Sequence, residues 1–119
     1  MGFFFRKRKI EGKTAEEWFD LGYKEKDPKK KIEYYSKCLK LDPKNAVAWF
    51  AKGFALDDSG RNEEAIRCYD KALEIDPENE EVKNDKKLAE EKLKGYYRAK
   101  IEQWKSEGYN VSELEEMLK

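Results

Sequence analysis

The side chains that most often carry out chemistry in proteins are scarce in this sequence. It contains no histidine, which removes the Ser-His-Asp and Cys-His arrangements of nucleophilic catalysis and most zinc sites. Cys38 and Cys68 lie 30 residues apart, and the sequence has neither a Cys-x-x-Cys pair nor a glycine-rich phosphate loop. Aspartate and glutamate are so numerous that no pair of carboxylates stands out. The sequence therefore predicts no catalytic residue, no metal site and no cofactor.

Aromatic and small residues, in contrast, recur at a fixed interval. Tyr35 and Tyr69 lie 34 residues apart, as do the dipeptides Asp42-Pro43 and Asp76-Pro77. The second copy of the pattern contains Trp49, Gly53, Leu56, Gly60, Ala65, Tyr69, Ala72 and Pro77, and the first keeps Trp18, Leu21, Gly22, Tyr35 and Pro43. A period of this length is typical of helical arrays whose units bury their apolar faces by stacking.

Composition and charge restrict the class of protein further. The 119 residues suit one domain, and 26 basic residues balance 26 acidic ones. The basic excess that favours nucleic acid is absent, and no apolar stretch approaches the roughly 20 residues of a membrane helix. The apolar residues at 3–5 come before the basic residues at 6–9, which is the reverse of a secretory signal. We expect a small cytoplasmic domain with no membrane span and no nucleic-acid partner.

Capping residues divide the chain into six expected helices. Thr14 and Glu17 have the spacing of a capping box, and Asp27 precedes Pro28, which suits the first position of a helix. The other expected caps are Asn45, Asn62, Asn79 and Ser112, the last as part of a second capping box. These signals predict helices over 14–26, 28–41, 46–59, 62–75, 79–105 and 112–118. No segment alternates with period two for long, so no strand is expected.

On these motifs the chain resembles a tetratricopeptide repeat protein. The unit of that family reads Trp-x2-Leu-Gly-x2-Tyr, then Ala-x3-Phe, then Pro. The resemblance is close over residues 15–77 and loose over 78–105. Lys52 and Leu56 depart from the pattern in the second repeat. The first repeat is three residues shorter at its helix–helix turn and carries Glu25 and Lys31 where Tyr and Ala belong.

The resemblance implies an all-α fold. Antiparallel helix pairs would form a short right-handed solenoid, followed by a long C-terminal helix. The expected parts are a basic and aromatic tail at 1–13, a first repeat at 14–45, a second repeat at 46–79, and a capping region at 80–119 with a long and a short helix.

The repeated residues also account for an expected core. Gly22 and Gly53 lack a side chain and allow the paired helix to approach closely, which offsets the roughly 1 kcal/mol that a helical glycine costs. The small residues at the facing positions are Ala65, Ala72 and Cys38. Cys68 lies beside Tyr69, and we expect both cysteines to be buried, reduced thiols. The space between the helices would be filled by Trp18, Tyr35, Trp49 and Tyr69.

A second set of apolar residues falls on another helical face. These residues follow the packing positions by one place, which is about 100° around the helix. By resemblance, the first helices of the pairs line the concave surface where tetratricopeptide domains hold ligands. The expected groove residues are Phe19, Tyr23, Val47, Phe50 and Phe54. An exposed apolar strip of this kind marks an interaction site, unless the chain's own ends cover it.

One known use of such a groove does not fit these residues. Tetratricopeptide domains that bind the acidic C-termini of heat-shock chaperones clamp a carboxylate with lysine and asparagine. Here the corresponding positions carry Phe19, Tyr23 and Ala51, with Glu81 and Asp85 at the equivalents in the third helix pair. Acidic residues would repel a carboxylate, so that co-chaperone role is not expected.

The C-terminal region carries a further apolar stripe. Tyr96, Tyr97, Ile101 and Trp104 extend it past the length of one repeat helix, so part of it has no partner within the repeats. Either the last helix folds back over it through a turn at Gly108, or another chain covers it. Gly95 weakens the helix where a bend or an exchange could begin.

Two functions follow, of different classes. The leading hypothesis is a small adaptor that binds a protein or peptide in the groove. The alternative is a self-assembling subunit that forms a homodimer through the long C-terminal helix and the tail, with Tyr96, Tyr97, Ile101 and Trp104 as its contacts. The segment of residues 3–9 is left open between a disordered tail, a segment docked in its own or a neighbour's groove, and a weak contact with a membrane or nucleic acid.

Overall fold

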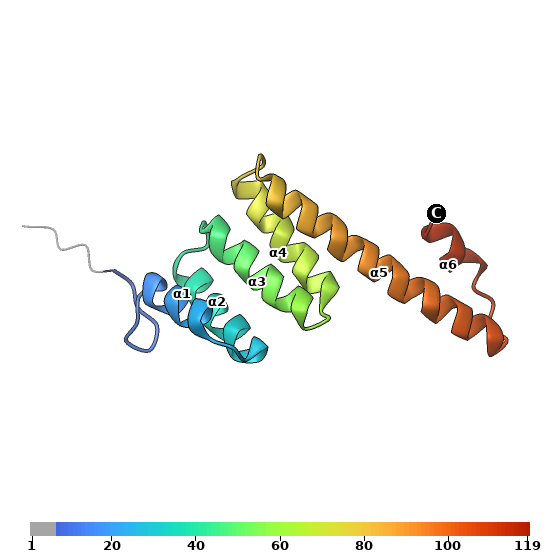
Figure 1. Ribbon diagram of the computed structural model, residues 1–119, viewed down its shortest axis with the longest axis horizontal. Helices are drawn as coiled ribbons and strands as arrows, with labels where there is room; N and C mark the ends of the chain where they lie inside the picture. The colour runs from blue at the N-terminus through green and yellow to red at the C-terminus, as the bar shows by residue number, and fades with distance from the viewer. Residues whose placement is uncertain (1–6) are drawn as a thin grey trace, which may run out of the picture.

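The computed structural model describes residues 7–119, which are all-helical apart from their turns and one isolated backbone bridge (Figure 1). The helices are α1 (Ala15–Lys24), α2 (Pro28–Leu41), α3 (Ala46–Asp58), α4 (Asn62–Ile75), α5 (Glu80–Ser106) and α6 (Ser112–Met117). Every predicted helix is present, with its ends within two residues of the predicted ends. The all-α fold is thus confirmed. The expectations for Phe3 to Arg6 lie outside the described residues.

Side-chain caps account for most helix starts. The Thr14 capping box is confirmed: the Glu17 amide donates to Thr14 Oγ1 (3.3 Å), and the Thr14 amide donates to Glu17 Oε1 (3.1 Å). Asp27 accepts from the Lys29 amide before Pro28 at the start of α2. Asn45 and Asn79 cap α3 and α5 in the same way, each through its side-chain oxygen.

Two predicted caps are wrong. α4 has Arg61 at its N-cap, and Asn62 lies inside the helix, where its amide nitrogen donates to Asp57 Oδ1 at 2.6 Å. α6 also begins without a side-chain cap, because Ser112 Oγ and the Ser112 amide both donate to Asn110 Oδ1. In each place the polar side chain donates a hydrogen bond to a nearby carboxylate or amide oxygen, and it does not accept one from the amides at the helix end.

Helices that follow one another in sequence pack as antiparallel neighbours, α1 on α2, α2 on α3, α3 on α4 and α4 on α5. Two glycines set how closely the paired helices approach. A Cβ added at Gly22 would lie 2.6 Å from the Tyr35 ring, and one at Gly53 would lie 2.6 Å from the Tyr69 ring. Non-bonded carbon atoms do not approach each other so closely, so both positions require glycine for this packing.

The predicted core is largely confirmed. Trp18 and Tyr35 are 3% exposed and Tyr69 is fully buried. Trp49 differs, because it lies at the junction between the two repeats and is only half-buried. Its indole N–H donates to the Pro43 carbonyl at 2.8 Å, so one edge of the ring faces the turn instead of the core.

The first half of α5 closes the array. Val82 and Ala89 follow Ala48 and Ala55 by one 34-residue period, and all four side chains are buried. α5 therefore packs on α4 as the first helix of a third pair. The positions equivalent to Trp49 and Gly53 are Lys83 and Lys87, both exposed, so the face that would receive a further helix is charged.

The second half of α5 extends beyond the repeats, and the molecule is 73 Å long (Figure 1). The expected weak point at Gly95 causes no break, since α5 is continuous from Glu80 to Ser106. α6 folds back beside the end of α5, where Ile101 and Val111 are buried and Lys105 pairs with Glu115 at 3.1 Å. The sequence left two ways to cover the C-terminal stripe, by the last helix of the same chain or by another chain. The structure contains the first of these, the fold-back of the last helix.

None of the helices described over residues 7–119 is long and apolar enough to cross a membrane. The cytoplasmic location expected from the sequence stays a prediction.

Candidate protein-binding groove

The five residues expected to line a groove come from α1 and α3, and we call them the groove face: Phe19, Tyr23, Val47, Phe50 and Phe54. They divide into two kinds. Tyr23, Val47 and Phe54 are exposed to 73%, 63% and 51%. Phe19 and Phe50 are half-buried against core tyrosines, with ring centroids 5.4 Å from Tyr35 and 5.9 Å from Tyr69.

The expectation that this whole set stands apart from the core is therefore wrong for Phe19 and Phe50. The core face and the groove face are only about 100° apart around the helix, so a phenylalanine at the boundary is wide enough to contact both. Phe19 and Phe50 rest on the core below, and Tyr23, Val47 and Phe54 project into solvent above them.

The groove face continues onto α5 through Leu88, which the sequence analysis missed. Leu88 follows Phe54 by one 34-residue period and is 59% exposed. α3 and α5 contact each other directly, so the equivalent positions of these helices lie on neighbouring elements. The signal was present in the repeat period. It was overlooked because the third helix pair matches the repeat pattern only loosely.

Carboxylates adjoin the groove face on α3 and α5. Burial raises the pKa of the Asp85 carboxyl, the negative charges of Glu81 and Asp57 raise it further, and the ammonium of Lys92 lowers it. Lys92 Nζ lies 3.2 Å from Asp57 Oδ1. Three carboxylates thus share this end of the groove face with one nearby cation.

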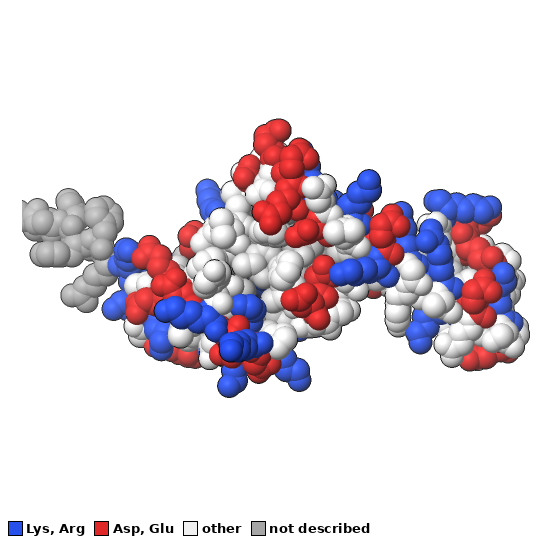
Figure 2. Space-filling model, viewed as in Figure 1, with Lys and Arg blue, Asp and Glu red and all other residues white. Residues whose placement is uncertain are grey.

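The distribution of charge over the surface is uneven (Figure 2). Uncharged atoms gather in the middle of the view, over α3 and α4, whereas acidic side chains gather where α4 joins α5. That turn and the start of α5 carry Asp76, Glu78, Glu80 and Glu81.

The residues expected to mediate self-association lie at the far end of α5. Only Tyr96, at 56%, is strongly exposed, and Ile101 is covered at 5%. The Tyr97 hydroxyl donates to Glu63 on α4. A largely apolar cavity of about 320 Å³ separates α5 from α6 and is lined by Tyr97, Ile101, Trp104, Leu114, Met117 and Leu118.

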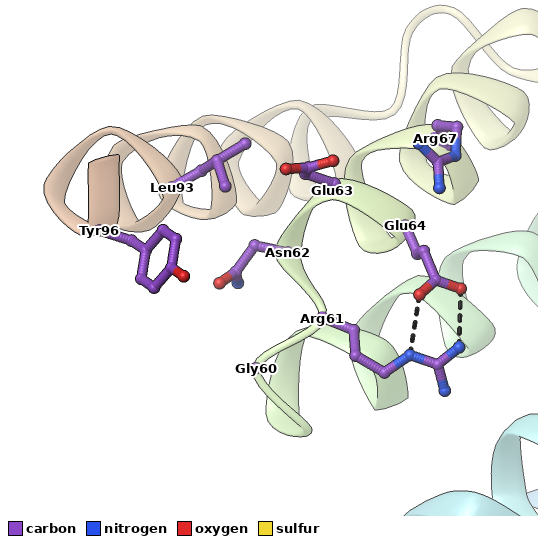
Figure 3. A pocket seen from close by; sticks show the side chains of 8 residues that line it. All are labelled: Gly60, Arg61, Asn62, Glu63, Glu64, Arg67, Leu93 and Tyr96. Carbon is purple, nitrogen blue, oxygen red and sulfur yellow. Dashed lines mark hydrogen bonds and ion pairs between the residues drawn. The ribbon is translucent and has the colours of Figure 1, made fainter. Parts of the chain in front are cut away.

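Another hollow, also about 320 Å³, lies between the start of α4 and α5 (Figure 3). Its main cation is already neutralised, because Arg61 donates two hydrogen bonds to Glu64, at 2.9 and 2.7 Å. Leu93 and Tyr96 from α5 form the opposite wall, and the Tyr96 ring faces Asn62. The mixed lining offers no concentration of charge or apolar surface for a ligand.

Comparison with known families decides the class of this repeat. Two family models, both described as tetratricopeptide repeat, match residues 20–45 and 46–79, together about half of the chain. The chain belongs to the tetratricopeptide repeat family. Tetratricopeptide repeats are protein-interaction modules and typically not catalytic, so the coarse function of this chain is protein binding.

Three relatives share part of the tetratricopeptide region. The small glutamine-rich tetratricopeptide repeat-containing protein 2 of Mycosarcoma maydis is 43% identical over 62 residues. An uncharacterised protein of Methanocaldococcus jannaschii is 40% identical over 50 residues. The peroxisomal targeting signal receptor of Saccharomyces cerevisiae is 35% identical over 57 residues. The matches cover 52%, 42% and 48% of this chain, but only 18%, 58% and 9% of the relatives. The likeness is therefore to a part of each relative.

The two thiols of the tetratricopeptide core are buried, as predicted. Cys38 is fully buried and Cys68 is 5% exposed, and neither forms a disulfide. Burial raises the pKa of the Cys38 thiol to about 11, with a smaller contribution from the carboxylate of Asp42. Burial also raises the pKa of Cys68. Both thiols thus stay protonated and unreactive at neutral pH.

We expect the free energy of unfolding to fall as the pH rises from about 9 towards 11. The unfolded chain loses the Cys38 proton near the ordinary pKa of 9.0, whereas the folded chain holds it to about 11. The folded state therefore binds more protons in this window. The contribution of Cys38 to the free energy of unfolding, about 2–3 kcal/mol, is fully present below pH 9 and is lost as the pH rises to about 11. Urea unfolding at several pH values measures the slope. Cys38→Ala should have a shallower slope, since every other titrating group is common to both proteins. Equal slopes would contradict the assignment.

Proposed function

We propose that the groove face of α1 and α3 holds an extended or helical segment of a partner protein, as an adaptor would. The observation that supports this most strongly is the exposure of large apolar side chains at equivalent positions of successive first-of-pair helices. Tyr23 is 73% exposed and Phe54 is 51% exposed. Core packing does not explain them, because their rings are largely in water.

The aromatic side chains beneath the exposed rings support the same proposal. Phe19 and Phe50 are fixed against Tyr35 and Tyr69, so they form a rigid apolar floor. A partner side chain placed between Tyr23 and Phe54 would cover this floor and remove the exposed rings from water. Aromatic residues placed in this way dominate the energetics of many interfaces.

A paired substitution tests the proposal. Tyr23→Ala with Phe54→Ala should weaken binding by roughly 30-fold or more, since truncation of an aromatic contact at an interface costs about 1 kcal/mol or more each. The probe is a library of random 12-residue peptides displayed on phage and selected against the wild-type chain. Affinities of the selected peptides are then measured by fluorescence anisotropy.

The matched control is Ile75→Ala, which removes an apolar side chain, 41% exposed, from the end of α4 outside the groove face. It should leave the affinity unchanged. Thermal unfolding should show little change in any of these variants, because exposed side chains leave no cavity when truncated. Equal affinity for the wild type and the paired variant would refute binding at the groove face.

A second candidate is self-association through the far end of α5 and α6. Tyr96 and Met117 are exposed to 56% and 79% there, beside the cavity between the two helices. Ile101 is already covered, so a dimer would form over Tyr96, Trp104 and α6 and not over the whole predicted set. Light scattering over a wide concentration range decides it, since a monomer at every concentration excludes this candidate.

A further inference from the structure

One end of the groove face carries negative charge, opposite in sign to the chain's own basic segments. Asp57, Glu81 and Asp85, which we call the acidic cluster, adjoin Phe54 and Leu88 on α3 and α5. Partial burial raises the pKa of the Asp85 carboxyl, and the repulsion of Glu81 and Asp57 raises it further. Placing like charges together at a partly buried position costs free energy. The helix dipole does not require an acidic residue at Asp85, because Asp85 lies beyond the first turn of α5.

Of the contacts that the structure describes over residues 7–119, those that offset the charge of the cluster are made to Asp57. Lys92 and Asn62 both contact Asp57, at 3.2 and 2.6 Å. Among residues 7–119, neither Glu81 nor Asp85 forms an ion pair with any lysine or arginine. Glu81 is in the first turn of α5, where the helix dipole favours it. For Asp85 the nearby ammonium of Lys92 offsets burial and repulsion only in part, because the pKa of the carboxyl stays raised.

A buried hydroxyl beneath the same surface is also unsatisfied. Within the described part of the chain, the Tyr69 hydroxyl has no hydrogen-bond partner, although the side chain is fully buried. Burial raises the pKa of Tyr69, and the charges of Asp57, Asp85 and Asp58 raise it further, so the hydroxyl lies within the field of these carboxylates. Phe50 of the groove face packs on the same ring. An uncharged but unpartnered polar group therefore lies beneath the acidic cluster, within the field of its carboxylates.

We propose that the partner segment is an apolar one with basic side chains, and that one of its lysines or arginines binds Asp85 and Glu81 while its apolar side chains cover Phe54 and Leu88. This inference rests on the proposed function and adds the chemical class of the partner. A cation at this point would relieve the repulsion within the acidic cluster. It would also form charge-assisted hydrogen bonds, which are about twice as strong as neutral ones.

The probes are the peptides selected on the wild-type chain, each synthesised in three versions with lysine, glutamine or glutamate at the basic positions. We expect the lysine version to bind about tenfold more tightly than the glutamine version, and the glutamate version to bind weakest. Asp85→Asn with Glu81→Gln should remove most of this preference without changing the affinity for the glutamine version. The control Glu102→Gln removes an exposed carboxylate from the far half of α5 and should leave the preference intact.

Four results would overturn the inference. If the selected peptides lack basic residues, or if the three versions bind equally while Phe54→Ala still weakens all of them, the groove function stands and the charge assignment fails. If Phe54→Ala weakens none of them, the proposed function itself fails. If the lysine version binds only after residues 1–6 are deleted, the occupant is the chain's own segment of Phe3 to Arg6, not a partner.

Discussion

Replacing Tyr69 with alanine is expected to lower the free energy of unfolding by about 3–5 kcal/mol, the largest effect of any single substitution in the repeats. The side chain is fully buried. Its ring fills the space that Gly53 leaves open and supports Phe50 from below. Truncation would leave a cavity between α3 and α4 that cannot close, because the backbone at Gly53 already lies against the ring.

Urea unfolding followed by circular dichroism measures this loss, with Tyr69→Phe as the matched control. That change keeps the ring and removes only the hydroxyl, which lacks a hydrogen-bond partner. It should therefore leave stability unchanged or raise it by about 1 kcal/mol. A loss below 1 kcal/mol in Tyr69→Ala would mean that the helix pair does not pack as described.

Removing α5 is expected to have the second large effect. A chain that ends at Asp76 exposes the face of α4 that Val82 and Ala89 cover, and should lose about 4 kcal/mol or more. A chain that ends at Lys94 keeps both residues and the contact of Lys92 with Asp57. It loses α6 and the hydrogen bond from Tyr97 to Glu63, and should lose about 1 kcal/mol.

The comparison of the two truncations by thermal unfolding separates the roles of the two halves of α5. Equal losses would show that residues 77–94 add nothing and that the far half of α5 with α6 accounts for all of the stabilisation. Full stability in the chain that ends at Asp76 would contradict the role of residues 80–94 as a cap.

The repeat period predicted the helix pairs because packing residues must recur wherever the same unit is stacked. Tyr35 and Tyr69 were therefore assigned correctly to the core, as were the glycines opposite them. The same period, applied to the third pair, would have identified Leu88. Period alone could not show that Trp49 is half-buried, since its exposure depends on the turn at Pro43.

Polar side chains near helix ends were less predictable. Asn62 and Ser112 have the right type and place for caps, but each donates to a side-chain oxygen a few residues before it, Asp57 and Asn110 respectively. Glu81 and Asp85 were placed at groove positions from the sequence, but the part of Asp57 in the acidic cluster was hidden, because Asp57 and Asp85 come together only when α5 packs beside α3. Sequence spacing fixes which residues share a helix face, but not which charges meet across two helices.

The most direct test of binding at the groove face is an NMR titration of the chain with a selected peptide, following side-chain methyl signals. Methyl groups report on both candidate surfaces, with Val47 and Leu88 on or beside the groove face and Ile101 and Leu114 at the far end of α5 and α6. We expect the peptide to shift the signals of Val47 and Leu88 and to leave those of Ile101 and Leu114 unchanged. Shifts at Ile101 and Leu114 with Val47 and Leu88 unchanged would contradict binding at the groove face.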